Sequence, residues 1–287
     1  MFHENKASYR EWRAAKLASY PRRVAELLVE IDGLATLEPG DKDRILGCFR
    51  RANMAIYTCR DPSVDRAAIR AFAAHFGLQR LDHHLCANDD GVSELTVTTE
   101  DQRAGYVPYS DRSLSWHTDG YYNDDSRSVR AVVLHCAQDA KSGGENAILD
   151  PEIAYIRLRD ADPAFITAFE HPQCMTIPAN VGDQGEIRPA VEGPVFSYGP
   201  ADGALHMRFS ARKRNIRWRD DSATTAAREH LAGLLAEDNG PVLNYRLQPG
   251  QGLISNNVLH NRTAFKDGAG NKRLLYRARF FDRVDSS

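Results

Sequence analysis

Several features that would narrow the class of protein are missing from this sequence. It has five cysteines in 287 residues, an odd number, and no Cys-x-x-Cys pair occurs. Neither a disulfide framework nor a zinc knuckle is therefore expected. No apolar run approaches the roughly 18 residues that a membrane-spanning helix needs, and the polar, charged N-terminal segment does not resemble a secretory signal. These absences lead us to expect a cytoplasmic protein that does not act at a membrane.

The charge balance gives no sign of a polyanionic partner. Lys and Arg number 37 against 39 Asp and Glu, a formal net charge of -2. Nucleic-acid-binding domains usually carry a basic surplus, so no nucleic-acid partner is expected. Hydrophobic residues make up 42% and charged residues 26% of the chain, which is ordinary for a globular protein. A small-molecule partner is the remaining expectation, and a homo-oligomer stays open.

The first third of the chain is predicted to be mostly helical, with one short strand. Apolar residues recur at helical spacing over 9–31, where Pro21 breaks the pattern, and 41–53 and 63–76 are also predicted to be helices. Ser63 is the expected N-cap of the third of these helices. The run MAIYTC, 54–59, is rich in β-formers and is typical of a strand.

Beyond the first third, the pattern changes to short β-rich runs that Gly, Pro, Asn and Asp separate. Helical spacing returns only over about 151–170 and 223–238. We therefore predict a single domain over 1–287 that is mainly β with α. Its parts are an N-terminal helical layer, 1–91, and a β-sandwich or barrel core with helical insertions, 92–287.

One short motif places two metal-binding side chains on the same side of a strand. In WHTDG, His117 and Asp119 are two residues apart, and residues i and i+2 of a strand point to one face. A third ligand must come from elsewhere, and His260, which follows the β-like run GLISNN, is the best candidate. Two histidines and one carboxylate with open positions form the facial triad of iron(II) oxygenases. A His-x-Asp pair alone is also common on ordinary strands, so the distal histidine matters.

Arginines near the C-terminus fit an acidic co-substrate of such an iron site. The stretch KRLLYRARFF places Arg273, Arg277 and Arg279 at even spacing, so that in a strand they share one face. 2-Oxoglutarate chelates iron through its 2-oxo acid end, and its C5 carboxylate then needs a buried cation. An arginine can bind that carboxylate with two parallel hydrogen bonds. The spacing leaves open which of the three does so, and an exposed strand is the alternative.

Four motifs in this order, WHTDG, SGGEN, NNVLHNRTAF and KRLLYRARFFD, resemble the superfamily of taurine dioxygenase and gamma-butyrobetaine hydroxylase. The resemblance covers about residues 50–283. It implies a double-stranded β-helix, or jelly roll, with helical insertions. It also implies an Fe(II)- and 2-oxoglutarate-dependent dioxygenase that uses O2 to hydroxylate a small organic substrate and releases succinate and CO2.

The resemblance assigns catalytic iron ligation to His117, Asp119 and His260. It makes Arg273 the partner of the C5 carboxylate. Arg277 resembles a second arginine, which contacts the chelating end of the co-substrate or an anionic substrate. Asn146 stands where many relatives have a threonine that also binds 2-oxoglutarate, and an amide can donate a hydrogen bond in its place.

The expected substrate is a small polar molecule, with a carboxylate or sulfonate as the favoured group. Arg277 shares a face with Arg273, and Arg208 and Arg212 can add positive charge. Because a buried charge without a counter-charge is costly, this supply of arginines favours an anionic substrate. Two other classes remain open. One is a jelly-roll hydrolase or isomerase with the same three ligands, which has no need of Arg273, and the other is a silent ligand-binding relative.

Overall fold

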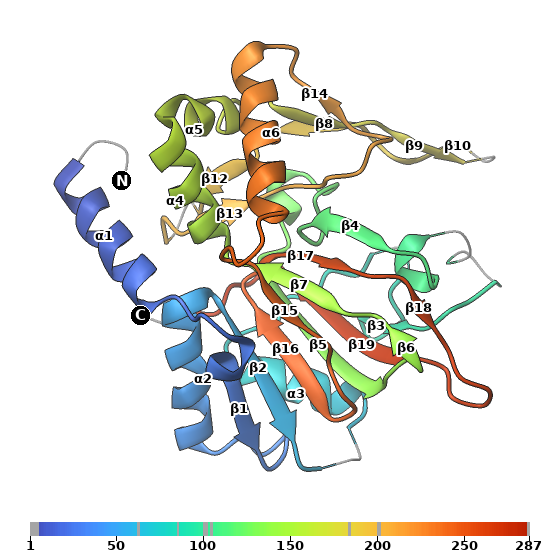
Figure 1. Ribbon diagram of the computed structural model, residues 1–287. Helices are drawn as coiled ribbons and strands as arrows, with labels where there is room; N and C mark the ends of the chain where they lie inside the picture. Colours follow the sequence, from blue (N-terminus) through green and yellow to red (C-terminus); the bar gives the residue numbers. More distant parts are fainter. Residues whose placement is uncertain are drawn as a thin grey trace. The chain divides into compact units, whose positions relative to one another are not determined.

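The computed structural model describes residues 6–285 apart from 62–63, 85, 100–102, 104–105, 183–184 and 200–201. It is a mixed α/β structure with six α-helices and many short strands among these residues (Figure 1). The chain forms two compact units. The first unit comprises Met1–Tyr20, Trp116–Ser128 and Leu149–Val242, and the second comprises Pro21–Ser115, Val129–Ile148 and Leu243–Ser287. No helix within the described ranges is long and apolar enough to cross a membrane.

A six-stranded sheet forms the centre of the second unit (Figure 1). Its order is β1-β2-β16-β5-β19-β3, and all neighbours are antiparallel except β1 and β2. The strands are β1 (Leu28–Ile31), β2 (Met54–Cys59), β3 (Val92–Leu95), β5 (Ala131–Gln138), β16 (Gln251–Ser255) and β19 (Leu274–Phe280). Helix α2 (Pro39–Ala52) packs on β1 and β2, and α3 (Arg66–Ala74) packs on β5 and β19. The sheet therefore joins early and late segments of the chain.

A smaller sheet of the second unit includes three neighbouring strands in the order β15-β7-β17. They are β7 (Asn146–Leu149), β15 (Leu243–Tyr245) and β17 (Leu259–Arg262), whereas β4 (Leu114–His117) passes from the second unit into the first. The short strand β6 (Ser142–Gly143) precedes β7 in the chain, and β18 (Phe265–Lys266) follows β17. These two short strands form an antiparallel pair. Two 3-10 turns, η1 (Val24–Leu27) and η2 (Val107–Tyr109), complete the second unit.

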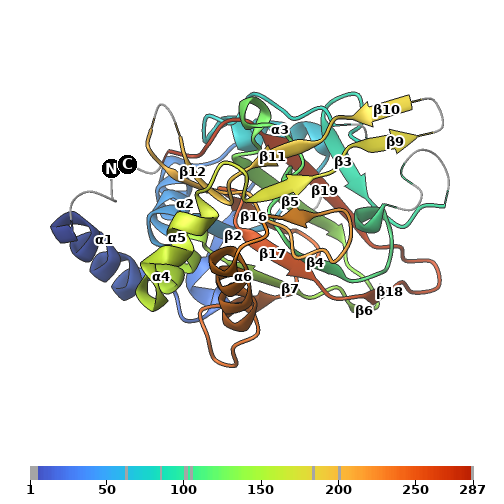
Figure 2. The ribbon, with the colours of Figure 1, turned by 90° about the horizontal axis from the view of Figure 1, so that it is seen from above.

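The first unit holds helices α1 (Lys6–Ser19), α4 (Pro151–Ala161), α5 (Pro163–Phe169) and α6 (Ser222–Leu235). Helices α4, α5 and α6 pack side by side (Figure 2). Asp150, Asp162 and Asp221 cap their N-termini by accepting hydrogen bonds from first-turn N–H groups. Asp150 is also fully buried and lies 2.6 Å from Lys16 of α1. This ion pair fastens α1 to the start of α4.

Short strands fill the rest of the first unit. They form one three-stranded sheet, β11-β8-β14, and two hairpins, β9–β10 and β12–β13. Their bounds are β8 (Met175–Ile177), β9 (Asn180–Gly182), β10 (Gly185–Arg188), β11 (Val191–Gly193), β12 (Phe196–Tyr198), β13 (Leu205–Met207) and β14 (Arg217–Trp218). A 3-10 turn, η3 (Asp125–Arg127), lies between β4 and β5 in the chain.

Most of the predicted elements are present, but the end of the first predicted helix is wrong. The helical spacing over 9–31 continues to residue 31, whereas the structure has the turn η1 and then strand β1 (Leu28–Ile31). Leu28–Ile31 pairs in parallel with β2 over four residues, and this sheet pairing overrides the local helical pattern. The N-terminal layer is therefore not only helical, since it supplies two strands to the central sheet.

The predicted cap of the third helix is also wrong. Helix α3 begins at Arg66, and its N-cap is Asp65, whose side chain accepts a hydrogen bond of 2.8 Å from the N–H of Ala68. Ser63 itself lies outside the described residues. Both aspartate and serine are favourable N-caps, so the sequence pattern located the helix but not its first residue.

A buried histidine, His135, lies in the central sheet of the second unit. His135 on β5 and Tyr57 on β2 flank Gly252 of the intervening strand β16. A Cβ at Gly252 would lie 2.2 Å from the Tyr57 hydroxyl, so only glycine lets the two side chains meet. The Tyr57 hydroxyl lies 3.2 Å from Nδ1 of His135. Burial lowers the pKa of His135 to about 4.

Stability is predicted to fall in mild acid because of His135. The unfolded chain binds a proton at this residue below pH 6.5, whereas the folded chain does not until about pH 4. The neutral ring is therefore favourable above that window, and up to about 3 kcal/mol of unfolding free energy is lost as the pH falls through it. Urea unfolding at pH 7 and pH 4.5 measures the loss, and His135→Gln is the matched control. An equal loss in the variant would assign the acid sensitivity to other groups.

Candidate functional site

The His-x-Asp motif lies where β4 ends in the first unit. His117 is the last residue of β4 and bridges to Ser210 on the opposite segment, and Thr118 N–H donates to the carbonyl oxygen of Phe209 at 3.0 Å. A turn at Gly120, which has a φ of 68°, then ends the strand. His117 and Asp119 are 6% and 5% exposed. Two ordinarily solvent-exposed residue types are thus buried at one strand end, which is the placement that a metal-binding pair needs.

Tyr121 packs against His117. Its ring meets the imidazole of His117 edge to face, with centroids 6.3 Å apart. Nη1 of Arg212 donates a hydrogen bond of 2.9 Å to the Tyr121 hydroxyl. The aromatic ring therefore limits the orientation of His117, and Arg212 limits that of the ring.

Arg208 has a structural role that the sequence did not indicate. Its guanidinium is buried and donates hydrogen bonds of 2.8–3.2 Å to four backbone carbonyls. These belong to Tyr121, Met175, Val191 and Gly193. Burial lowers the pKa of Arg208 to about 10. Because its donors bind the backbone of the first unit, we no longer count it among the groups that could bind a substrate anion.

His260 lies on β17 in the second unit. It follows a turn that is stabilised by buried asparagines. Asn257 in this turn has a φ of 51°, and its side chain donates to the carbonyl oxygen of Val129 at 2.6 Å. Nδ1 of His260 lies 2.9 Å from the carbonyl oxygen of Val258. A carbonyl can only accept, so Nδ1 is the donor in this hydrogen bond. Metal-binding histidines usually have this arrangement, with one nitrogen bonded to the backbone and the other directed to the metal.

Arg273 is a buried arginine beside a small cavity of the second unit. It precedes β19, is 6% exposed, and its guanidinium lies 4.9 Å from the centroid of the Phe265 ring. Burial is the main cause that lowers the pKa of Arg273. Its guanidinium makes no hydrogen bond or ion pair with any residue that the structure describes. A buried cation in this state is costly unless an anion binds to it.

Asn146 lines the same cavity as Arg273. It is the first residue of β7, and its Nδ2 donates to the carbonyl oxygen of Asn261 at 2.8 Å. The structure therefore brings together these two residues, which the sequence had assigned to co-substrate binding. Sequence reasoning missed two others that line the cavity, Asp139 and Arg246, because no motif or spacing connects residues so far apart in the chain.

The Gly-Gly turn of SGGEN forms one wall of this cavity. Gly143 and Gly144 have φ values of 73° and 77°, and both line the cavity. A Cβ at Gly143 would lie 2.2 Å from the carbonyl oxygen of Ala264, whereas a Cβ at Gly144 would lie no closer than 3.6 Å to any atom. Gly143 is thus required for the pairing of β6 with β18.

Alanine at these two positions is predicted to have unequal effects. Both substitutions place a side chain at positive φ, which costs roughly 1–2 kcal/mol. Gly143→Ala additionally forces apart packed backbone, a strain that typically adds about 1–3 kcal/mol. Urea unfolding of the two variants measures the difference, with Gly144→Ala as the matched control. Equal destabilisation would mean that the approach of Ala264 is not a constraint.

The three arginines of the C-terminal strand are all buried, so the alternative of an exposed strand is wrong. Arg279 forms an ion pair with Asp82, and both side chains are almost fully inaccessible. The backbone also joins them, since the N–H of Asp82 donates to the carbonyl oxygen of Arg279 at 2.8 Å. This pairing gives Arg279 a structural role. Arg277 is buried opposite Ser93 of β3.

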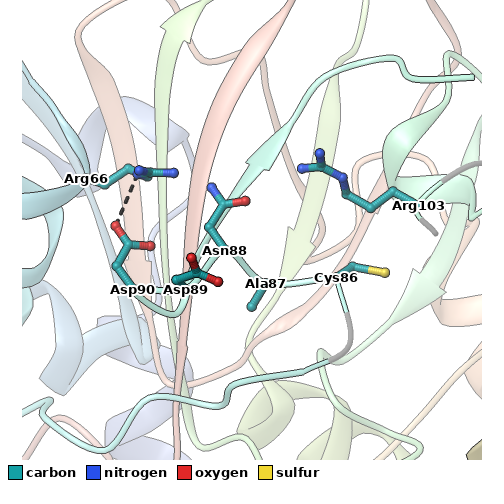
Figure 3. A pocket seen from close by; sticks show the side chains of 7 residues that line it. All are labelled: Arg66, Cys86, Ala87, Asn88, Asp89, Asp90 and Arg103. Atoms are coloured by element: carbon teal, nitrogen blue, oxygen red, sulfur yellow. Dashed lines mark ion pairs between the residues drawn. The ribbon is translucent and has the colours of Figure 1, made fainter. Parts of the chain in front are cut away.

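A second cavity of the second unit has a volume of about 620 Å³ and is more open (Figure 3). It is lined by Arg66, Cys86, Ala87, Asn88, Asp89, Asp90 and Arg103. Arg66 pairs with Asp90 at 3.1 Å, and Figure 3 shows Arg103 on the opposite side of the view. None of the predicted site residues lines this cavity.

The predicted iron ligands are divided between the two units. His117 and Asp119 belong to the first unit, and His260 belongs to the second. Within either unit, the described residues contain no cluster of three His, Cys, Asp or Glu side chains that could hold a metal ion. The three-residue iron site therefore stays a prediction.

Comparisons with known proteins agree with the resemblance. The model of the family described as taurine catabolism dioxygenase TauD, TfdA family, matches residues 28–279. Among similar solved structures is an asparagine oxygenase in complex with Fe(II), 3-hydroxyasparagine and succinate, with 16% identity, a TM-score of 0.60, and coverage of 88% of this chain and 93% of that one.

Two further structures have the same fold. One is a putative alpha-ketoglutarate-dependent taurine dioxygenase from Burkholderia xenovorans, with 16% identity, a TM-score of 0.59, and coverage of 90% of this chain and 88% of that one. The other is PvcB from Pseudomonas aeruginosa, with 17% identity, a TM-score of 0.58, and coverage of 89% and 85%. Because the family model matches most of its length, the chain belongs to the TauD and TfdA family of dioxygenases.

Proposed function

We propose that this Fe(II)- and 2-oxoglutarate-dependent dioxygenase holds its iron with His117, Asp119 and His260 and binds the C5 carboxylate of 2-oxoglutarate with Arg273. We further propose that its core is a double-stranded β-helix, as the resemblance implies. The observation that carries the proposal is the buried guanidinium of Arg273, which has no acidic partner among the described residues and lies beside a cavity.

The donor set fits iron(II). One carboxylate and two imidazoles leave about three octahedral positions for a bidentate co-substrate and O2. The backbone hydrogen bond at Nδ1 of His260 supports this assignment, because it leaves Nε2 as the metal-binding nitrogen. The position of His117 and Asp119 supports it as well, since two residues that are two apart at a strand end can present an imidazole and a carboxylate to one ion. With Fe(II) and 2-oxoglutarate bound, the site supplies O2-dependent oxidation coupled to release of succinate and CO2.

Charge compensation explains why Arg273 should bind the distal carboxylate. An iron(II) ion with one aspartate carries about one positive charge, and the 2-oxoglutarate dianion changes this to about one negative charge. The guanidinium of Arg273 then restores approximate neutrality in a site of low dielectric. Its planar fork also fixes the orientation of the carboxylate, which lysine would not do. Asn146 lines the same cavity and adds an amide that can donate to the co-substrate.

For the substrate, we propose a small polar molecule, with an anionic group favoured. The sequence-based expectation places such a group beside Arg277, which is buried on β19. The asparagine oxygenase structure shares the fold and contains a small polar amino acid product. An apolar or cationic substrate is the alternative if Arg277 binds the chelating end of 2-oxoglutarate.

The rival classes make a different prediction about 2-oxoglutarate. A hydrolase or isomerase that used the same three ligands would not need a buried arginine for a distal carboxylate, and a silent relative would not turn over. The direct test is to supply Fe(II), 2-oxoglutarate and a panel of small carboxylates, sulfonates and amino acids, and to measure succinate and O2. We expect at least one compound to raise succinate formation and O2 consumption in equal amounts. Product formed from the panel without 2-oxoglutarate would favour the rivals.

A further inference from the structure

The cavity beside Arg273 has an ion pair on its outer side. Nη2 of Arg246 lies 2.9 Å from Oδ2 of Asp139 and also donates to the carbonyl oxygen of Ala140. Arg246 and Asp139 both line the cavity. Their side chains are 28% and 24% exposed, whereas Arg273 is 6% exposed. The ion pair therefore lies nearer to solvent than Arg273, which is at the buried end.

The sheet topology explains why these residues meet. Asp139 follows the last residue of β5, and Arg273 precedes the first residue of β19. These strands are antiparallel, and Leu274 is paired with Gln138. The end of one strand thus lies beside the start of the other, which places Asp139 and Arg273 at the same end of this strand pair. Arg246 follows β15 of the smaller sheet, and its side chain meets Asp139 there.

The charges of the two arginines are compensated differently. Asp139 neutralises Arg246, so that pair contributes no net charge to the cavity. Arg273 has no such partner among the described residues. The cavity as a whole therefore carries about one positive charge, which suits one terminal carboxylate. A second negative group, or a carboxylate that reached farther outward, would have to displace Asp139 from Arg246.

We propose that Asp139 and Arg246 close the outer end of the co-substrate cavity and thereby set the length of the 2-oxo diacid that the enzyme accepts. This inference rests on the proposed role of Arg273. A five-carbon diacid ends at Arg273, with the wall of Gly143 and Gly144 on one side. A six-carbon diacid bound at the same iron position would extend its carboxylate into the ion pair. The ion pair determines which co-substrate length binds and does not take part in the oxidation.

Equilibrium binding tests this proposal without measuring turnover. The Fe(II)-loaded protein is titrated calorimetrically, without O2, with 2-oxoglutarate and with 2-oxoadipate. One methylene changes binding in a closed pocket by about 10- to 200-fold, so we expect the wild type to prefer 2-oxoglutarate by about 10-fold or more. Asp139→Ala should reduce this preference to within about 3-fold, chiefly by tightening 2-oxoadipate, because Arg246 is then left for the extra carboxylate. The double variant opens the outer end without leaving an unpaired charge and should also reduce the preference, whereas Arg246→Ala alone leaves an unpaired Asp139 that repels the longer diacid.

Arg60→Ala is the matched control, since Arg60 pairs with Glu30 and Asp32 on the surface of the second unit and does not line the cavity. It should keep the wild-type preference. An unchanged preference in both Asp139→Ala and the double variant, or a wild type that binds both diacids equally, overturns the proposal. Arg273→Ala shows whether only the role of the ion pair is wrong or the proposed role of Arg273 is wrong as well. If Arg273→Ala retains full affinity for 2-oxoglutarate, the co-substrate does not occupy this cavity, and the proposed function of Arg273 fails as well.

Discussion

Replacing Arg273 with alanine is expected to weaken 2-oxoglutarate binding by about 30- to 5,000-fold, because losing one member of a desolvated charge pair costs about 2–5 kcal/mol. Iron(II) binding should change little, since Arg273 carries no metal-binding group. Calorimetric titration of the iron-loaded protein with 2-oxoglutarate, in the absence of O2, measures the first effect. A separate titration with Fe(II) measures the second.

Stability distinguishes this functional role from a structural one. The Arg273 guanidinium is buried without an acidic partner among the described residues, so Arg273→Ala should not lower the unfolding free energy of the ligand-free protein. Arg279→Ala is the matched contrast on the same strand. It leaves Asp82 buried without its partner, which should cost about 3–5 kcal/mol. Urea unfolding measures both variants.

Arg273→Lys provides a second comparison. Lysine keeps the positive charge but cannot form two parallel hydrogen bonds to a carboxylate. Its affinity for 2-oxoglutarate should therefore lie between those of wild type and Arg273→Ala. Unchanged affinity in Arg273→Ala would contradict the assignment and move the role to Arg277, which is buried on the same strand.

Loss of any proposed iron ligand is expected to abolish 2-oxoglutarate turnover. Residues that only support a metal ligand change metal affinity by about 10- to 100-fold when they are replaced. Asp119→Ala and His260→Ala remove ligands themselves, so Fe(II) affinity should fall by more than about 100-fold. Calorimetric titration with Fe(II) measures the fall, and circular dichroism checks that the variants are folded.

Asp124→Asn is the matched control for Asp119→Ala. Asp124 is an exposed aspartate five residues farther along the same segment, and its carboxylate accepts a hydrogen bond from the hydroxyl of Ser126. It should bind Fe(II) as the wild type does. Wild-type affinity in Asp119→Ala or in His260→Ala would remove that residue from the set of ligands.

Much of the fold could be predicted from local sequence patterns. The errors lie where pairing with a distant segment determines the secondary structure. The strand MAIYTC is β2 as predicted, because its β-branched and aromatic residues agree with its place in the sheet. Leu28–Ile31 reads as the end of a helix, but it becomes β1 through pairing with β2. No local signal contains that pairing, because it depends on a segment more than twenty residues away.

The same distinction holds for the candidate site. The motif spacing proposed His117, Asp119 and His260 as iron ligands, and the family resemblance proposed Arg273 as the carboxylate partner, because these residues lie in short recognisable runs; all four roles stay predictions. The roles of Arg208 and Arg279 could not be predicted, since each depends on partners that only the folded chain supplies. The Asp139–Arg246 pair was missed for the same reason: the register of β5 with β19 brings Asp139 to Arg273.

Fe(II) and 2-oxoglutarate are proposed to bind together at one site of this chain. Visible absorption of the Fe(II)-loaded protein, recorded without O2 during addition of 2-oxoglutarate, tests this proposal most directly. Chelation of the metal by the 2-oxo acid should produce a weak charge-transfer band that saturates at one equivalent in the wild type. The band should be absent in His260→Ala and should require far more 2-oxoglutarate in Arg273→Ala. A wild-type protein that binds Fe(II) but develops no band at saturating 2-oxoglutarate would contradict the account.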